Sequence, residues 1–190
     1  KKTIDYDNYS IDWVKRTSQI IFMNRTCFNG LFRVNSKGEF NVSFGKYKKP
    51  QICNRENLFA VSECLQGITI LRGDFESFKE EIDSESFVYF DPPYRPISKT
   101  ASFTSYSGNE FGDEEQMRLS EYFRELDSRG AKLLLSNSDP KNIDPDDDFF
   151  ESAYKGFNLF RVKANRMISC KGDKRGKINE LIITNYEADT

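Results

Sequence analysis

A short run of residues, Asp91-Pro92-Pro93-Tyr94, carries the groups with the clearest capacity for chemistry. It directly follows the apolar residues 87–90, whose aromatic and β-branched side chains are typical of a buried strand. Two consecutive prolines cannot continue a sheet ladder, so the chain must leave the strand in an extended, kinked form. One carboxylate, two backbone carbonyls and one aromatic ring are therefore expected at the rim of a sheet, where open α/β sheets bind ligands.

These groups suit a flat base that bears an exocyclic amine. Asp91 and a proline carbonyl can accept the two amino hydrogens while the ring of Tyr94 stacks on the base. An ordinary proline-rich turn explains the same residues equally well when they are taken alone. Other stretches of the sequence favour the first interpretation, a site that binds such a base.

Three stretches resemble one family. Asp-Pro-Pro-Tyr after an apolar strand resembles the catalytic motif of methyltransferases that act on adenine N6 in DNA. Residues 27–50 resemble the target-recognition hairpin of the Dam-type members, which recognise GATC and include type II modification methylases. Residues 101–106 resemble the segment that follows the catalytic motif in the same group. The resemblance extends over most of the chain, from about residue 20 to residue 186.

The resemblance implies transfer of a methyl group from S-adenosylmethionine to a flipped-out adenine. Asp91 and the carbonyl of Pro92 or Pro93 would accept the amine hydrogens, and Tyr94 would stack on the ring. Because the sulfonium donor needs no activation, alignment of the reactants is most of the catalytic task. The residues implied to contact the cofactor are Asp74, which would bind its adenine amine, Phe75, which would lie near that ring, and Asp91. The alternative is that Asp74 is a helix N-cap and Phe75 a core residue.

The same resemblance assigns DNA contacts to the recognition stretch. Arg33 matches the family's base-reading arginine, which can donate two hydrogen bonds to guanine O6 and N7. Phe28 stands where the family inserts an aromatic ring into the base stack, with Asn29 beside it, and the alternative for Phe28 is a core position. Further candidates for base or phosphate contacts are Asn41, Ser43, Lys46 and Lys48. Ser43 replaces a proline that is usual in the family. The basic loop 169–177 would also suit phosphates, although a surface loop without a partner fits it equally well.

The composition excludes several other kinds of site. The 190 residues carry a net charge of −2, contain no histidine, and include four cysteines that are far apart. A zinc site and a Ser-His or Cys-His nucleophile are therefore not expected, and no metal is assigned. The sequence contains nothing like a signal peptide or a membrane span. We expect a reduced, cytoplasmic protein that acts on double-stranded DNA in a bacterium or phage, with no membrane partner. By resemblance, a cognate restriction endonuclease in the same system is a further partner, without a stable complex.

The expected elements alternate in the order of a doubly wound α/β sheet of the methyltransferase type. Asn54 is the expected N-cap of one helix, and Asp113 and Gln116 have the spacing of a capping box at the start of another. Helices are expected over residues 11–22, 54–65, 75–82 and 113–130, with a short one after the acidic run 144–148. Strands are expected over residues 40–44, 68–71, 87–90, 132–135, 157–162 and 180–186. Residues 1–54 would form an inserted target-recognition subdomain with a β-hairpin, and residues 55–190 the carboxyl-terminal part of the catalytic core.

One departure from the family is pronounced. The glycine-rich segment that holds the methionine part of the cofactor has no counterpart among the eleven glycines of this chain. We therefore expect a fragment of a longer adenine methyltransferase. The alternative is a non-catalytic DNA-binding remnant of such an enzyme. Methylation of RNA or of a glutamine amide is a further alternative, against which Asp91 in place of asparagine and the recognition stretch both argue.

Overall fold

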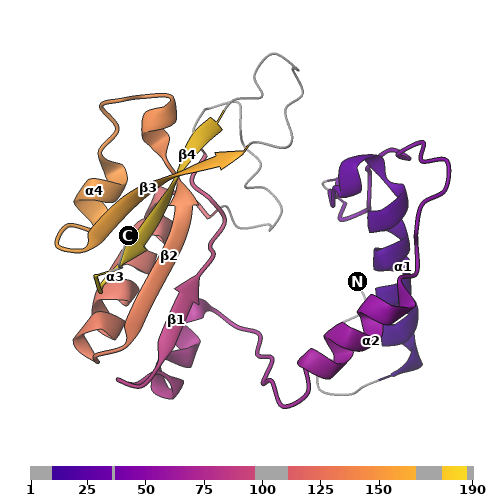
Figure 1. Ribbon diagram of the computed structural model, residues 1–190, viewed down its shortest axis with the longest axis horizontal. Helices are drawn as coiled ribbons and strands as arrows, with labels where there is room; N and C mark the ends of the chain where they lie inside the picture. The colour runs from indigo at the N-terminus through magenta and orange to yellow at the C-terminus, as the bar shows by residue number, and fades with distance from the viewer. Residues whose placement is uncertain (1–9, 36, 97–110, 166–176, 188–190) are drawn as a thin grey trace. The chain divides into compact units, whose positions relative to one another are not determined.

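The computed structural model describes residues 10–35, 37–96, 111–165 and 177–187. The chain forms two compact units, Lys1–Leu71 and Arg72–Thr190 (Figure 1). The predicted boundary at residue 54 separates a recognition region from a catalytic region by function. Compactness of the chain does not test such a boundary, so it stays a prediction.

The first unit contains helices α1 (Ile11–Thr26) and α2 (Arg55–Cys64) and the short 3₁₀ helix η1 (Phe28–Gly30). Both predicted α-helices are confirmed. The side chain of Asn54 accepts a hydrogen bond from the Asn57 amide at 3.1 Å, so the predicted N-cap of α2 is correct. Helix α1 runs past its predicted end at residue 22, and the Cys27 amide closes it on the Met23 carbonyl at 2.8 Å.

The recognition stretch doubles back on itself with little regular sheet. Its antiparallel pairing consists of two isolated bridges, Cys27 with Phe44 and Val34 with Phe40. The chain reverses near Gly38, whose amide donates to the Asn35 carbonyl at 2.8 Å. Gly38 has φ +76°, a left-handed conformation in which a side chain would be strained. The predicted strand over residues 40–44 is wrong, since two separate bridges do not make a continuous ladder.

A mixed four-stranded sheet forms the centre of the second unit, which is a mixed α/β structure. Its strand order is β1-β2-β4-β3. Strands β1 and β2 are parallel, and the other neighbouring pairs are antiparallel. The strands are β1 (Phe87–Phe90), β2 (Lys132–Ser138), β3 (Asn158–Asn165) and β4 (Lys177–Thr184). The strands predicted at these four places are confirmed, with bounds shifted by a few residues.

The predicted strand over residues 68–71 is wrong. Ile68, Ile70 and Leu71 are exposed and irregular, and no strand pairs with them in the part of the chain that the structure describes. An apolar, β-branched run favours extended backbone, but a strand exists only where a neighbour completes its hydrogen bonds.

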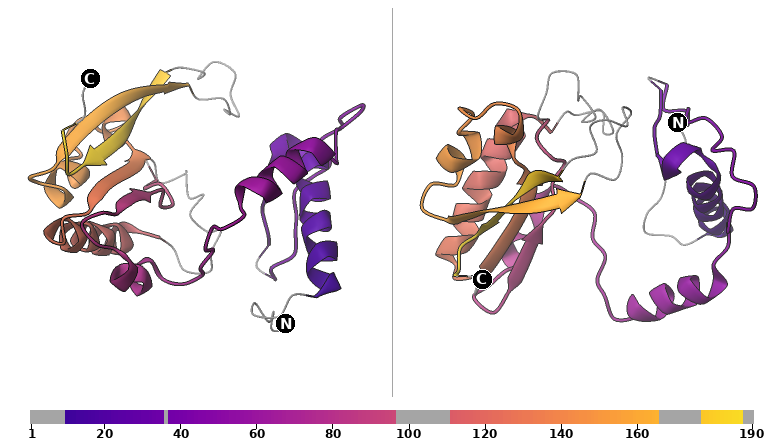
Figure 2. Two further views of the ribbon diagram at one scale, coloured as in Figure 1. Left: turned by 60° about the horizontal axis from the view of Figure 1, so that its bottom comes forward. Right: turned by 45° about the horizontal axis from the view of Figure 1, so that its top comes forward.

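The core of the second unit lies between the sheet and the helices α3 (Asp113–Ser128) and α4 (Phe149–Ala153), which cover the same face (Figure 2). Alternate residues of the central strands point into it, as the two-residue period of a strand requires. The apolar residues buried without exposed surface are Phe123, Leu126, Leu133, Leu135, Phe150, Leu181 and Ile183. In the described residues, no helix is both long enough and apolar enough to cross a membrane.

Candidate active site

The parallel register of β1 and β2 builds the rim at which the Asp-Pro-Pro-Tyr segment lies. Phe90, the last residue of β1, pairs with Leu135, so Asp91 follows beside Ser136. The Ser136 hydroxyl lies 3.0 Å from the Tyr89 hydroxyl and donates to Asp91 Oδ1 at 3.3 Å. The Asp91 side chain is exposed and therefore accessible to a ligand at the carboxyl end of the strand.

A cavity of about 790 Å³ opens at this rim, within the second unit. Its size falls in the range of small-molecule sites, about 300–1,000 Å³. Asp91, Pro92 and Pro93 line one part of it, and Asp74 and Phe75 line another. The structure thus brings three of the four predicted catalytic residues together with the predicted cofactor contacts, although the two sets are separated in the sequence; Tyr94 is not part of the cavity lining.

Asp74 and Phe75 lie at the start of the 3₁₀ helix η2 (Phe75–Glu81). Asp74 accepts the Glu76 amide at 3.1 Å, so it is an N-cap, and Phe75 packs against the core, as the alternative interpretation expected. Arg118 of α3 donates to both carboxylate oxygens of Asp74, at 2.9 and 2.8 Å, and its guanidinium lies 4.2 Å above the Phe75 ring. The Arg118 bonds, followed by the Glu76 amide, lower the pKa of Asp74. Asp74 is therefore a fixed, ionised acceptor in the cavity wall.

Tyr94 is half-buried behind the rim. Burial raises the pKa of its phenol, and a hydrogen bond with Ser136 opposes that shift. Nearby negative charge on Glu180 and Asp91 raises the pKa further. Tyr94 is consequently neutral at physiological pH, as a stacking ring should be.

Two fully buried amides, Gln116 of α3 and Asn137 of β2, hold the backbone on both sides of Tyr94. Gln116 Nε2 donates to the Pro93 carbonyl at 2.9 Å. Asn137 Nδ2 donates to Gln116 Oε1 at 3.1 Å, and Asn137 Oδ1 accepts the Arg95 amide at 2.9 Å. Together these side chains bridge the peptide groups that precede and follow Tyr94.

The capping-box prediction for α3 is wrong. The N-cap is Gly112, which has no side chain to cap the helix, and Gln116 is turned into the protein. Helical periodicity in the sequence could have revealed that Gln116 points into the core, because this residue shares the face of α3 that carries Leu119 and Phe123. An amide at a core position needs buried partners.

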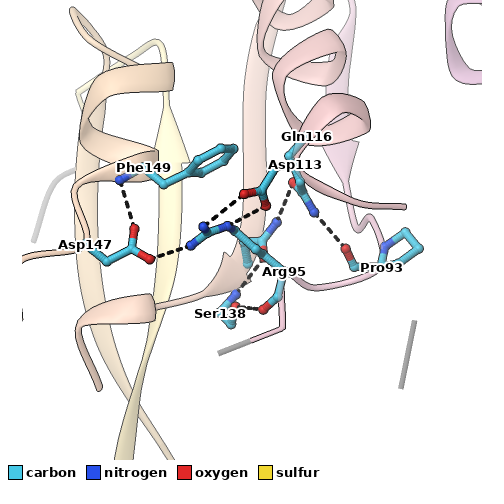
Figure 3. A network of polar contacts seen from close by, with 8 residues as sticks. Pro93, Arg95, Asp113, Gln116, Ser138, Asp147 and Phe149 are labelled. Carbon is cyan, nitrogen blue, oxygen red and sulfur yellow. Dashed lines mark hydrogen bonds and ion pairs between the residues drawn. The ribbon is translucent and has the colours of Figure 1, made fainter. Parts of the chain in front are cut away.

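Arg95, which sequence reasoning also missed, ties the same segment to two other elements (Figure 3). It donates to both carboxylate oxygens of Asp113, at 2.7 and 3.1 Å, and to Asp147 at 2.7 Å. Its guanidinium lies 4.3 Å from the Phe149 ring centre. Burial raises the pKa of Asp147, but the hydrogen bonds from Arg95 and the Phe149 amide outweigh this and leave the pKa lowered.

The residues predicted to contact DNA lie in the first unit, and two pairs of them are joined by hydrogen bonds. Arg33 donates from Nε to Asn41 Oδ1 at 2.8 Å and from Nη2 to the Asn41 carbonyl at 3.0 Å. The Phe28 amide donates to the Ser43 carbonyl at 2.8 Å. The Phe28 side chain is 52% exposed, which contradicts the alternative of a core aromatic.

The remaining predicted contacts are also on the surface. Asn29 and Lys46 both have positive φ, 54° and 55°, and Lys48 is exposed. The segment 101–106 and most of the basic loop, residues 169–176, lie outside the described residues. Within the ranges that are described, no group of three or more acidic or cysteine side chains is placed to hold a metal ion.

Comparison with known proteins identifies relatives along nearly all of the chain. Residues 4–168 match the family model of D12 class N6 adenine-specific DNA methyltransferases. The type II methyltransferase M.MjaIII of Methanocaldococcus jannaschii is 57% identical over 92% of this chain and 59% of its own length. The DNA adenine methylase of Escherichia coli strain K12 is 37% identical over 92% of this chain and 60% of its own length.

The chain spans about three-fifths of these relatives. A third, the type II methyltransferase M1.LlaDCHI of Lactococcus lactis subsp. cremoris, is 45% identical over 91% of this chain and 59% of its own length. The matched region includes every residue that lines the cavity, from Arg72 to Leu119. The chain therefore belongs to the D12 class of N6 adenine-specific DNA methyltransferases.

Proposed function

We propose that the complete protein transfers a methyl group from S-adenosylmethionine to N6 of adenine in double-stranded DNA. The observation that carries this proposal is the shared cavity, which is lined both by Asp91 and Pro92 and by Asp74 and Phe75. A transferase needs its acceptor and its donor side by side, and one cavity provides both sets of contacts.

Asp91 is the proposed acceptor of one hydrogen of the adenine amine, and the Pro92 carbonyl accepts the other. Pro92 is favoured over Pro93, because the Pro93 carbonyl already receives a hydrogen bond from Gln116. Accepting both hydrogens turns the nitrogen lone pair out of conjugation and toward the reacting carbon. Tyr94, neutral and held from both sides, stacks on the base.

The cavity residues fit the proposed cofactor. Bound S-adenosylmethionine supplies an electrophilic methyl group on a sulfonium. Asp74 is an ionised acceptor of the kind that an adenine amine needs, and Phe75 offers a ring beside it. The cavity lining carries three carboxylates, Asp74, Asp91 and Glu115, against the two guanidinium groups of Arg72 and Arg118. Its net charge is therefore negative, which a cationic ligand favours.

The recognition stretch is proposed to read GATC, with Arg33 bonding guanine and Phe28 entering the base stack. Its predicted contact residues are exposed, as base and phosphate contacts must be. In this proposal residues 1–54 are the inserted recognition subdomain, and the sheet is the carboxyl-terminal part of the doubly wound methyltransferase fold. Names of relatives such as "Type II methyltransferase" favour a DNA-modifying role. We propose that the protein acts in the cytoplasm, either alone or alongside a cognate endonuclease.

The test is methyl transfer by the complete protein. Labelled S-adenosylmethionine is incubated with a duplex that contains one GATC site, and a duplex already methylated at N6 on both strands is the control. We expect label only in the unmethylated duplex. Asp91→Ala should abolish transfer and leave duplex binding largely intact, because Asp91 meets the base only after flipping. Loss of binding in a folded Asp91→Ala protein would contradict its assigned role.

The second candidate is a non-catalytic DNA-binding remnant. The observation behind it is that the predicted DNA contacts, such as Phe28 and Arg33, are exposed in the first unit, whereas the cavity lies within the second. Equilibrium dialysis of this chain with labelled S-adenosylmethionine separates the two. Binding that is lost in Asp74→Ala would assign cofactor contacts to this chain, whereas DNA binding without cofactor binding would support the remnant.

A further inference from the structure

We infer that Gln116 and Asn137 are positioning residues for methyl transfer, holding Tyr94 and the Pro92 carbonyl in the geometry that receives the flipped base. The inference rests on the proposed function and extends it to two residues that touch neither base nor cofactor. It follows from how the backbone after β1 is held.

The sequence leaves this backbone without the usual means of support. Strand β1 ends at Phe90, and Pro92 and Pro93 have no N–H with which to continue its ladder. The neighbouring peptide groups are held by side chains instead. Gln116 binds the Pro93 carbonyl and Asn137 binds the Arg95 amide, at 2.9 Å each, while the Ser138 hydroxyl donates to the Arg95 carbonyl.

The two amides act as one unit because they are bonded to each other. Asn137 Nδ2 donates to Gln116 Oε1 at 3.1 Å, and neither side chain has exposed surface. Asn137 Oδ1 also accepts the Ser138 amide at 2.9 Å. A pair of buried side chains that are bonded to each other has few alternative rotamers. The pair therefore fixes the position of the Pro93 carbonyl relative to α3.

This arrangement matters more for chemistry than for binding. Tyr94 lies between two anchored peptide groups, and the Pro92 carbonyl belongs to the peptide that adjoins Pro93. If Gln116 releases Pro93, both the stacking ring and the acceptor carbonyl can shift. Displacements of about 1 Å at a reacting centre can cost on the order of 100-fold in rate, whereas ground-state contacts elsewhere remain.

The experiment compares variants of the complete protein on the GATC duplex. Gln116→Met keeps the length of the side chain but cannot donate to Pro93, and Asn137→Ala releases the Arg95 amide. The matched control is Asn185→Leu. Asn185 makes three comparable hydrogen bonds near the amino end of β2, the strand that carries Asn137. It accepts from the Leu133 amide at 2.8 Å and donates to Asp127 at 2.7 Å and to the Ala131 carbonyl at 2.8 Å.

We expect Gln116→Met to lower the single-turnover rate, at saturating DNA and cofactor, on the order of 100-fold. The dissociation constants for DNA and S-adenosylmethionine should change less than about threefold. Asn185→Leu should lose comparable thermal stability and keep its rate within about threefold of wild type. A general loss of stability would slow all three variants alike, so the control separates positioning from folding.

Two outcomes would overturn the inference. One is a folded Gln116→Met protein whose single-turnover rate matches wild type. The other is an Asn185→Leu protein that is slowed as much as the rim variants. If Gln116→Met does not fold, Asn137→Ala decides in the same way. A wild-type protein that methylates no DNA would refute the proposed function itself, and that result is distinct from either of these.

Discussion

Replacement of Arg95 by alanine should destabilise the second unit and leave the first unchanged. Arg95 follows the catalytic segment and joins it to α3 through Asp113 and to the loop before α4 through Asp147. The side chains of Arg95 and Asp147 are only 17% and 24% exposed, whereas that of Asp113 is 59% exposed. The two ion pairs should therefore contribute unequally to stability.

The magnitude follows from these exposures. The bond to the half-buried Asp147 is charge-assisted and contributes about 1.5–3 kcal/mol. The exposed Asp113 pair is screened by solvent and contributes about 0.2–1 kcal/mol. The guanidinium over Phe149 adds about 0.5–1 kcal/mol. Because these contacts share one side chain, they do not add independently, and we expect a loss of about 2–4 kcal/mol in the free energy of unfolding.

Urea unfolding of the 190-residue chain measures this loss. Far-ultraviolet circular dichroism follows both units, whereas the fluorescence of Trp13, the one tryptophan of the sequence, reports the first unit. With a slope of about 2 kcal/mol per molar urea, the midpoint of the second unit should fall by about 1–2 M. The fluorescence transition should stay in place.

Lys79→Ala is the matched control, since it also removes one positive charge. Its ion pair with Glu125 is 3.6 Å long and exposed on both sides, so its loss should cost less than about 1 kcal/mol. Arg95→Lys should lie between the two, because an ammonium cannot reach both carboxylates in the fork geometry. The reasoning is refuted if Arg95→Ala unfolds within about 0.5 kcal/mol of wild type, or if Lys79→Ala loses as much.

Three further predictions concern recognition, acid stability and the core. Arg33→Ala should reduce discrimination at one base pair of the site by about 1–3 kcal/mol. Competition binding with singly substituted duplexes measures this loss of discrimination. An unchanged sequence preference would show that Arg33 does not read a base. The lowered pKa of Asp147 means that its stabilising effect is present above the unfolded value, about 3.9, and is lost as pH falls through the lower folded value. The urea midpoint should therefore drop as pH falls below about 4, less steeply in Asp147→Asn. An equally steep drop in the two proteins would contradict this role of Asp147. Phe123→Ala should cost about 3–5 kcal/mol in urea unfolding, because this fully buried ring contacts Phe90, Tyr154 and Phe157; a loss under about 1 kcal/mol would show that the core refills the space.

Local patterns in the sequence sufficed for the helices and for the position of the catalytic segment. The apolar spacing of α3 and the N-cap Asn54 depend on residues within a few positions of one another, so they can be read without knowing the fold. The same holds for a strand that must stop where two prolines follow. The strand predicted over residues 68–71 failed for the opposite reason, since its existence depends on a neighbour that local sequence does not specify.

By itself, then, the sequence determined the chemical groups of the site and the strand end that carries them, Asp91 to Tyr94. Only the tertiary structure decided what those groups meet. The parallel register of β1 and β2 sets Ser136 beside Asp91, and the packing of α3 on the sheet turns Gln116 to the Pro93 carbonyl and Arg118 to Asp74. Hydrogen bonds between residues far apart in the chain require that every intervening element be placed, and composition and periodicity do not carry that information.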